Sequence, residues 1–322
     1  MKSICAAKPC EWLAQEYRQE RQVYHVEKIR FRGVEGRDVY NIAAPIVDGG
    51  RAIIPARVEP RHSEFSEVIF FEEAEDGVWT VVEGLRTFRG LQDPFHARIH
   101  GEIVFGGVEI WTNPFHNHEI EYRTVFYRGH SLADLRLFAV GPQWMKDIRL
   151  VELPDERVGV FTRPNGARYG GQAQIGWTVL SSLDELSPES ILRAECLPDR
   201  FYPGEWGGVN EAQLIDPATV GVLGHIAYRS EDGLLHYKAM CFSLHLNLDL
   251  VTPVRVIAER QDFLGGEAKR PELADVVFSG GLVRYPDGTA HLYAGVSDAE
   301  AQRILIPDPF AVTASCAVEL KA

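Results

Sequence analysis

Short β-rich runs separated by turn residues dominate this chain and constrain its fold more than any other feature. β-branched and aromatic residues gather in short stretches flanked by Gly, Pro, Asp and Asn, a pattern typical of strands joined by turns. Helical patterns are confined to residues 8–22 and 187–195. Because no helices alternate with the strands, we expect an all-β sandwich, barrel or propeller. Clear strand runs are 51–58, 66–73, 102–111, 121–127, 157–163, 219–228, 236–244, 275–285 and 290–297.

The strand runs recur at long intervals along the chain. Groups of strands followed by a charged linker begin near residues 37, 95, 147, 210 and 275, roughly 40–65 residues apart. This spacing suits four-stranded blades around an axis, each too small to bury its own face. The groups are alike in layout only, so the spacing favours a propeller over a sandwich without fixing the number of blades.

Composition excludes several classes of protein. The 322 residues are 45% hydrophobic, ample for a sizeable core, but no apolar run is long enough to cross a membrane or to act as a secretory signal. The net charge of −13 argues against nucleic acid as a partner and requires any anion site to be built from a few converging basic residues. The five scattered cysteines are expected to be reduced thiols of a cytoplasmic protein.

Motifs for cofactors and metals are lacking in the sequence. There is no phosphate-binding loop of the G-x-x-x-x-G-K-[ST] type, no dinucleotide fingerprint and no G-x-S-x-G elbow. His116 and His118 would share a strand face near Glu119, but no third ligand is evident. We therefore predict neither a metal nor an organic cofactor.

An Asp-Pro pair at Asp93 and Pro94 opens a predicted strand. Proline fixes its own φ and restricts the residue before it, so the aspartate lies on a stiff corner. A catalytic acid benefits from such a fixed position, although the same pair also occurs in ordinary turns. The local sequence leaves both interpretations open.

Basic residues flank one apparent hairpin. Lys146 and Arg149 precede it, and Arg163, held before Pro164, follows it. A guanidinium at such a position can bind phosphate or carboxylate with two hydrogen bonds. The same residues could equally form surface salt bridges.

A third cluster contains aromatic residues and a histidine. Trp206, beside glycines, could offer its face to a sugar ring. His225 lies in an otherwise apolar strand, where a core role and a ligand role are both open. Tyr237 and Lys238 alternate faces, so only one of them can point toward a shared site.

The last strand group carries a glycine pair and an aspartate. Gly280 and Gly281 permit another backbone to approach closely. Asp298 ends a strand of small residues, where its carboxylate could bind sugar hydroxyls or simply close a turn.

In their order along the chain, these clusters resemble the β-mannoside phosphorylases of glycoside hydrolase family 130. They resemble more closely the β-1,2-mannosyltransferases and phosphorylases of glycosyltransferase family 108, formerly a domain of unknown function numbered 1861. The likeness runs from about Asp38 to Phe310. It implies an all-β fold, a five-bladed β-propeller, over residues 37–322, preceded by a short N-terminal extension of residues 1–36.

The resemblance also implies roles for individual residues. Asp93 stands where the family has its catalytic acid. The residues implied to bind the sugar are Asn41, Arg57 (in the ARVE segment 56–59), Ser66, Trp206 and Asp298. The residues implied to bind phosphate are Lys146, Arg163, His225 and Tyr237.

Two departures from the family pattern concern the phosphate side. The relatives have an arginine where Lys146 stands, unless Arg149 takes its place, and a lysine after the tryptophan that corresponds to Trp206. Here the segment after that tryptophan has no lysine, so the predicted pocket is less cationic. A sugar phosphate or a nucleotide sugar therefore remains open as co-substrate beside inorganic phosphate.

The resemblance predicts an inverting β-1,2-mannoside phosphorylase or mannosyltransferase, which interconverts β-mannosides plus phosphate and α-mannose 1-phosphate. Its partners would be mannose-containing oligosaccharides and phosphate, with no nucleic acid or membrane; the oligomeric state is not indicated. One alternative is an inverting β-mannoside hydrolase, with Glu211 or Glu205 as the base at about 6.5–9.5 Å from the acid. Another is a non-catalytic propeller that binds glycans.

Overall fold

The computed structural model describes residues 1–114, 119–169 and 171–311, and it confirms the all-β class. The two predicted helical stretches contain α1 (Cys10–Glu20) and α2 (Pro188–Leu192). Within the described ranges, no helix combines the length and apolarity needed to cross a bilayer. Short 3-10 turns occur at Ala167–Tyr169, Leu183–Glu185, Leu246–Leu248, Arg260–Asp262 and Pro271–Leu273.

The first sheet is built on an antiparallel run near the start of the chain. Its strands are β4 (Asp38–Tyr40), β6 (Arg51–Glu59), β7 (Glu67–Glu73) and β8 (Trp79–Val81), joined by β3 (Phe31–Arg32), β5 (Ile46–Asp48) and β9 (Phe88–Arg89). Phe31 and Arg32 pair in parallel with Trp79 and Thr80, so the segment before residue 37 already belongs to this sheet.

Two four-stranded antiparallel sheets follow in sequence order. The second sheet contains β10 (Leu91–Ile99), β11 (Glu102–Thr112), β12 (Ile120–Gly129) and β13 (Arg136–Val140). The third contains β14 (Arg149–Glu152), β15 (Val158–Thr162), β16 (Gly176–Leu180) and β17 (Glu195–Cys196). Each strand pairs with its neighbour in the chain, as expected for consecutive meanders.

The remaining strands form one ladder with two antiparallel parts. One part has β18 (Trp206–Asp216), β19 (Thr219–Arg229) and β20 (Leu235–His245), flanked by β21 (Leu250–Val251), β22 (Arg255–Ala258) and β1 (Lys2–Ser3). The other has β23 (Asp275–Arg284), β24 (Thr289–Val296), β25 (Glu300–Pro307) and β2 (His25–Lys28). A short parallel pairing of His236–Tyr237 with Asp275–Val276 joins them. The proposed boundary at residue 36 stays a prediction.

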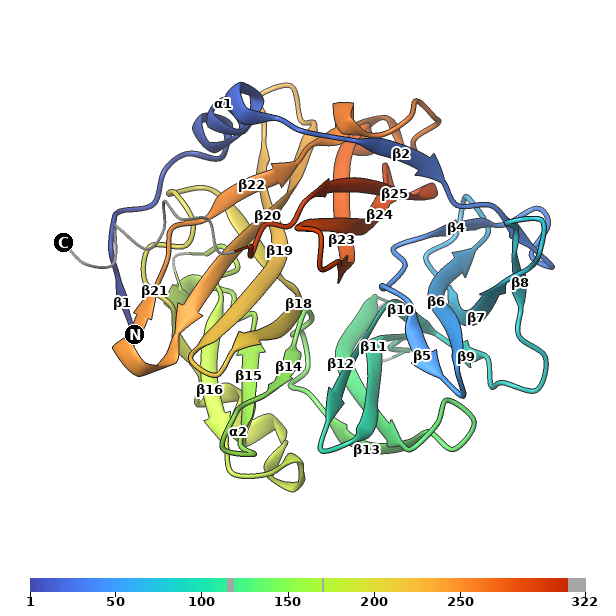
Figure 1. Cartoon of the computed structure of the whole chain (residues 1–322), viewed down its shortest axis with the longest axis horizontal. Helices are drawn as coiled ribbons and strands as arrows, with labels where there is room; N and C mark the ends of the chain where they lie inside the picture. The colour runs from blue at the N-terminus through green and yellow to red at the C-terminus, as the bar shows by residue number, and fades with distance from the viewer. Residues whose placement is uncertain (115–118, 170, 312–322) are drawn as a thin grey trace.

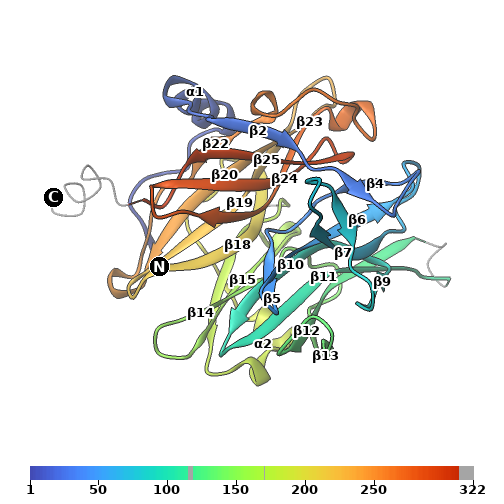
Figure 2. The ribbon, with the colours of Figure 1, turned by 45° about the vertical axis from the view of Figure 1, so that its right-hand side comes forward.

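The sheets lie in a ring around a common middle (Figure 1). Strands β10, β14, β18 and β23 lie nearest the middle, and each contacts the next; β10 also contacts β6, and β24 contacts β4, which closes the circle. In the view turned by 45°, β2 runs beside β25 and α1 lies outside β22 (Figure 2). The predicted group starts near residues 37, 95, 147, 210 and 275 thus fall at or near the first strand of each antiparallel run.

Side chains connect the strands around the middle where neighbouring sheets meet. Backbone N–H and C=O groups buried there need partners, and side chains of the adjacent sheet supply them. The bonds join His96 Nε2 to Ala44 O (2.8 Å), Arg149 Nε to Asn210 O (2.7 Å), Arg163 Nε to Gly207 O (2.6 Å), Leu282 N to Glu211 Oε2 (2.7 Å) and Ser279 Oγ to Gly224 O (2.7 Å).

Three of the central strands, β10, β18 and β23, each contain a β-bulge. The register shifts between Gln92 and Phe95 in β10, between Val209 and Glu211 in β18, and between Ser279 and Gly281 in β23. A bulge inserts one extra residue and re-aims the side chains beside it. The extra residues are therefore turned relative to the regular alternation of each strand.

The close approach predicted for the glycine pair of β23 is confirmed. A Cβ added to Gly280 would lie 1.7 Å from the backbone oxygen of Ile42, and one added to Gly281 would lie 2.6 Å from the Ala44 side chain. The segment after β4 is thereby packed directly against β23, which fixes Asn41 relative to the last sheet.

Replacing Gly280 with alanine should destabilise the protein by about 1–3 kcal/mol, because the new methyl group meets backbone rather than a movable side chain. Gly265→Ala is the matched control, since a Cβ there has no neighbour within 4 Å and should change the free energy of unfolding by less than about 0.5 kcal/mol. Urea denaturation of both variants measures the difference. Equal stabilities would contradict the packing of β23 on the Ile42 backbone.

Candidate active site

A cavity of about 180 Å³ lies where the central strands begin. It brings together residues from segments that are more than 200 positions apart in the sequence. Eight of the ten predicted site residues line it: Asn41, Arg57, Asp93, Lys146, Arg163, His225, Tyr237 and Asp298. The geometric condition of the sequence-based hypothesis, that the aspartate and the basic residues converge, is therefore met.

Four polar residues of this cavity have left-handed backbone conformations. Their φ values are 43° at Asn41, 47° at Asp93, 57° at Asp147 and 50° at Asp298. Asn and Asp are the non-glycine residues that tolerate this region best, and such strained positions concentrate at functional sites. Asp93 also differs from the extended conformation usual before proline, because it lies in the β10 bulge.

Asp93 is a buried carboxylate with two donors on the same oxygen. Its Oδ1 accepts a hydrogen bond of 2.8 Å from Asn41 Nδ2 and one of 3.1 Å from Arg57 Nη1. Burial alone would raise the pKa of Asp93, but the charges of Arg57 and Lys146 and the Asn41 bond lower it below its ordinary value. The carboxyl group is thus ionised at neutral pH in the unliganded protein.

The guanidinium beside Asp93 is held by a second buried carboxylate. Arg57 donates from Nε and Nη2 to Glu59 Oε2 at 3.1 and 3.0 Å. Glu59 in turn contacts the Tyr40 hydroxyl and the Lys269 ammonium group, all within the buried interior. Arg57 therefore stays charged and oriented through a network in which every buried charge has an opposite partner.

The pKa of Asp298 is shifted in the opposite direction to that of Asp93. Burial, reinforced by the nearby charge of Asp93, raises the pKa of Asp298 although Arg57 and Lys269 lower it. One cavity thus holds two carboxyl groups whose surroundings push their pKa values apart, an arrangement typical of acid–base sites.

Lys146 and Arg163 form the cationic side of the cavity. Lys146 has no ion-pair or hydrogen-bond partner among the described residues. Arg163 uses Nε both for its bond to Gly207 O (2.6 Å) and for its contact with Asp147 Oδ2 (3.3 Å). Its two terminal nitrogens make no hydrogen bond to any residue that the structure describes, so both side chains can still donate to an anion.

His225 and Tyr237 complete this side. The rings of His225 and Tyr237 stack with centroids 5.4 Å apart at 19°. Burial lowers the pKa of His225 to about 3, since Arg163 and Lys146 offset the opposing effect of Asp147. The imidazole is therefore neutral. The predicted alternation also holds, because Tyr237 lines the cavity while Lys238 is buried against Glu259 at 3.2 Å.

Ser66 and Trp206 lie outside the cavity lining. The Ser66 hydroxyl donates to Leu91 O at 3.0 Å and so fixes the start of β10, next to Asp93. Trp206 Nε1 donates to the Tyr237 hydroxyl at 3.1 Å, with the two rings edge to face. Both residues hold the surroundings of the cavity in place, and direct sugar contacts for them stay predictions.

Arg149 does not take the place of the missing family arginine. Its guanidinium is buried between β14 and β18, lies 4.2 Å over the Phe95 ring and donates to Asn210 O. Burial lowers the pKa of Arg149 to about 10 despite nearby carboxylates. Lys146, which precedes β14, lines the cavity, whereas Arg149, the first residue of β14, does not.

Sequence reasoning gave no role to several lining residues. Asp147 is buried, and Arg163 and Lys146 keep its pKa at about 2 against the effect of burial. Its position directly after Lys146 was a usable signal, whereas Glu64 and Gln92 carry none. The other residues that sequence reasoning missed are Leu235, Leu273, Val276 and Phe278.

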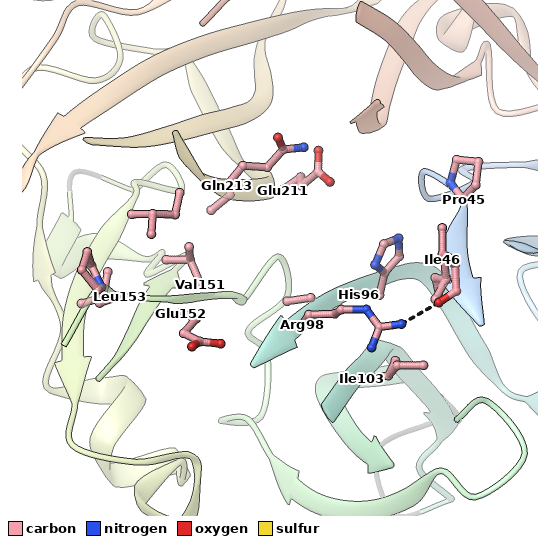
Figure 3. A pocket seen from close by; sticks show the side chains of 15 residues that line it. Pro45, Ile46, His96, Arg98, Ile103, Val151, Glu152, Leu153, Glu211 and Gln213 are labelled. Atoms are coloured by element: carbon pink, nitrogen blue, oxygen red, sulfur yellow. Dashed lines mark hydrogen bonds between the residues drawn. The ribbon is translucent and has the colours of Figure 1, made fainter. Parts of the chain in front are cut away.

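A second cavity, of about 550 Å³, contains none of the ten predicted residues (Figure 3). Glu211, one proposed base for hydrolysis, lines this cavity instead, where its carboxylate accepts the Leu282 N–H and burial raises its pKa to about 7. Glu205, the other proposed base, accepts the Cys10 N–H at 2.7 Å. Both expected positions are wrong, because these carboxylates bind backbone of neighbouring segments rather than face Asp93.

The histidine pair considered for metal binding, His116 and His118, lies outside the described residues. Within the described ranges, no group of three His, Cys, Asp or Glu side chains is close enough to hold a metal ion. The four described cysteines are free thiols.

The comparison with family models identifies one family. The model of the family described as "Protein of unknown function (DUF1861)" matches residues 15–312. No curated protein matches the chain.

Two solved structures of similar sequence come from Leishmania mexicana. The mannose phosphorylase MPT-4, in complex with phosphate ion, is 38% identical with a TM-score of 0.86, covering 93% of both chains. The GDP-Man-dependent mannosyltransferase MPT-1 is 30% identical with a TM-score of 0.85, covering 94% of this chain and 95% of that one. A β-1,2-mannobiose phosphorylase from Listeria innocua, 15% identical over 90% of this chain and 93% of that one with a TM-score of 0.62, shares the fold.

Arg57→Met should destabilise the protein by about 3–5 kcal/mol at neutral pH, since it removes the guanidinium from the buried Asp93 carboxylate and leaves Glu59 with Lys269 alone. Because the pKa of Asp93 is lowered in the folded protein, the ionised carboxylate stabilises the fold at pH values above the unfolded-state pKa of about 3.9. This stabilisation is lost as pH falls through the folded-state pKa, so the loss of stability in Arg57→Met should shrink toward pH 3.

Arg51→Met, which removes an exposed pair with Glu72, is the control and should cost less than about 1 kcal/mol. Denaturant unfolding at pH 7 and pH 3 compares them. A defect of equal size at both pH values would contradict the proposed ionisation of Asp93.

Proposed function

The chain belongs to the DUF1861 family, and from this membership and its cavity we propose that it is an inverting mannoside phosphorylase. Such an enzyme interconverts a β-mannoside plus phosphate with α-mannose 1-phosphate. The observation that carries the proposal is that a buried aspartate and two cationic side chains with spare donors, Lys146 and Arg163, line the same cavity. Two relatives named above, a mannose phosphorylase and a mannosyltransferase, support an enzyme of this class.

In the proposed mechanism, one side of the cavity binds the sugar and transfers the proton, and the other side binds phosphate. Asp93 donates a proton to the bridging oxygen in phosphorolysis and accepts it in synthesis, directly or through a sugar hydroxyl. Asn41, Arg57 and Asp298 hold the mannosyl ring. Phosphate enters on the opposite side and attacks the anomeric carbon. Because attack and departure occur on opposite faces, the configuration inverts and no second carboxylate base is needed.

The cationic side would bind and orient the phosphate. Lys146 and the terminal nitrogens of Arg163 have hydrogen-bonding capacity to spare, and Tyr237 and the neutral His225 add uncharged donors. Fixed donors in a cavity sheltered from water stabilise developing negative charge and hold the nucleophile in line.

The low pKa of Asp93 fits both directions of the reaction. In synthesis the ionised carboxylate is ready to accept the proton of an acceptor hydroxyl. In phosphorolysis a bound phosphate brings negative charge into the cavity, and a like charge nearby raises a carboxyl pKa. Phosphate binding would therefore favour the protonated Asp93 that leaving-group departure requires.

The number of blades, the linkage, the co-substrate and the location are also part of the proposal. We propose that the ring has five blades, with β18–β20 and β23–β25 as separate blades, and that β-1,2-linked mannose is the substrate. Inorganic phosphate or mannose 1-phosphate is the favoured co-substrate. A nucleotide sugar is the alternative, because one relative is a GDP-Man-dependent mannosyltransferase. The cytoplasm is the proposed location.

The hydrolase alternative loses its main support. An inverting hydrolase needs a carboxylate base across the substrate from the acid. Glu211 and Glu205, the candidates from the sequence, are bound to backbone N–H groups outside the cavity. No observation favours a purely glycan-binding propeller over an enzyme.

Incubation with β-1,2-mannobiose should release mannose 1-phosphate only when phosphate is present. Asp93→Asn should reduce this turnover by about 10²–10⁴-fold, since an amide cannot transfer the proton. Asp287→Asn, an exposed turn residue, is the control and should keep full activity. Free mannose released equally with and without phosphate would contradict the proposal.

Arg163→Met should raise the KM for phosphate by about 10–100-fold through loss of charged hydrogen bonds, with a smaller effect on the KM for the mannoside. Arg136→Met, at the exposed start of β13, is the control. Initial rates at varied phosphate and mannobiose concentrations separate the two constants. A variant whose KM rises only for the mannoside would place phosphate elsewhere.

A further inference from the structure

We propose that Asn210 is a positioning residue that fixes the proton of His225. Its side-chain amide donates to His225 Nδ1, so the imidazole proton stays on Nε2 and faces the cationic side of the cavity. The benefit to phosphate binding rests on the function proposed above, whereas the hydrogen-bond assignment stands on the geometry of buried groups alone.

Asn210 faces His225 because of the bulge in β18. Val209 pairs with Gly224 and Glu211 with Leu223, which leaves Asn210 as the extra residue. The Asn210 oxygen position lies 2.9 Å from His225 Nδ1. Both side chains are almost completely buried. At such a contact, the amide orientation and the histidine tautomer must be assigned from the surrounding hydrogen bonds.

The first argument concerns the Asn210 amino group. When the amide oxygen points at His225, Nδ2 has no hydrogen-bond partner within the described structure. Two buried N–H groups are then unsatisfied, which is rare in proteins. Turning the amide places Nδ2 against His225 Nδ1 and leaves one carbonyl oxygen unpaired instead, a less unusual situation.

The second argument comes from Ser279. Its hydroxyl lies 2.7 Å from Gly224 O and 3.3 Å from the Asn210 oxygen position. A hydroxyl has one proton, and the shorter contact to Gly224 O takes it. The Ser279 oxygen then presents lone pairs to Asn210, which suits an amino group there rather than a second oxygen.

The third argument comes from Asp147 on the other side of the ring. Its Oδ2 lies 4.0 Å from His225 Nε2, and Arg163 and Lys146 keep this carboxyl ionised. A carboxylate is attracted by an N–H and repelled by a nitrogen lone pair. The neutral imidazole carries one proton, and this neighbour favours it on Nε2.

The ring plane is fixed as well. His225 packs between Tyr237, at 5.4 Å and 19°, and Phe278, at 5.4 Å and 37°. The imidazole therefore cannot exchange its two nitrogens by turning over without displacing both rings. The amide contact decides which nitrogen carries the proton, and the stacking decides where that nitrogen points.

A neutral Nε2–H donor would contact phosphate without itself titrating near neutral pH. The charged groups that act on His225 lie on the elements packed around it: Asp147, Lys146, Arg163 and Arg149. Three of the four are cations, so the site as built disfavours an imidazolium. Asn210→Asp changes this balance, because its carboxylate only accepts hydrogen bonds and stabilises a proton on Nδ1.

NMR of the full-length protein labelled with ¹⁵N-histidine tests the assignment. The His225 signals are those lost in His225→Gln. In the parent protein at pH 7, Nε2 should carry the proton and Nδ1 should show the shift of an unprotonated acceptor. In Asn210→Asp the proton should appear on Nδ1, while the exposed control Asn247→Asp should match the parent. A parent protein with the proton on Nδ1 overturns the proposal, even if the variant fails to fold.

Phosphate affinity provides the functional readout. Asn210→Asp binds phosphate through a protonated His225 at low pH, but as pH rises the ring loses its Nε2 proton. The ratio of variant to parent Kd for phosphate should therefore grow by roughly 10-fold from pH 5.5 to 8, and the ratio cancels the ionisation of phosphate itself. A ratio constant with pH overturns the role in phosphate binding. Absence of phosphate binding by the parent, with the predicted tautomer observed, would refute the proposed function and leave the hydrogen-bond assignment intact.

Discussion

The buried contact between Asp93 and Arg57 is the interaction on which the rest of the site depends. A carboxylate removed from water needs compensation, and here Arg57 and Asn41 supply it on a single oxygen. Arg57 itself needs Glu59, and Glu59 needs Lys269, which arrives from the loop before the last sheet. The ionised state of one aspartate is therefore maintained by segments far apart in the sequence, and the closed ring of sheets brings them together.

The same requirement explains how the other side of the cavity is organised. Asp147 contacts only Nε of Arg163, so Lys146 and the terminal nitrogens of Arg163 keep donors that no described residue uses. His225 is held neutral, so it adds a directed hydrogen bond without another charge. An anion that binds there meets cations on one side and the negative Asp93 on the other. Such a field is suited to holding phosphate while controlling the protonation of the aspartate.

The sequence predicted the elements that depend on local pattern. Strand runs, the helices around Cys10–Glu20 and Pro188–Leu192, and the close approach at Gly280 all follow from composition and turn chemistry. The convergence of Asp93 with Arg163 came from the family resemblance, since no local signal reports contacts across so many residues. The sequence left Arg149 open as a site residue and offered Glu211 and Glu205 as bases, because residue type does not reveal that a charged side chain binds the backbone of a neighbouring segment. Asn210 was missed because a bulge, invisible in the alternation of β18, turns it toward His225.

A crystal structure with phosphate and mannose bound together tests the central claim most directly. The account predicts phosphate oxygens within hydrogen-bond distance of Lys146, the terminal nitrogens of Arg163 and Nε2 of His225. It predicts the sugar between this phosphate and Asp93, with the anomeric carbon facing the phosphate. Phosphate bound in the larger cavity beside Glu211, or a sugar that leaves the Asp93 carboxylate untouched, would contradict it.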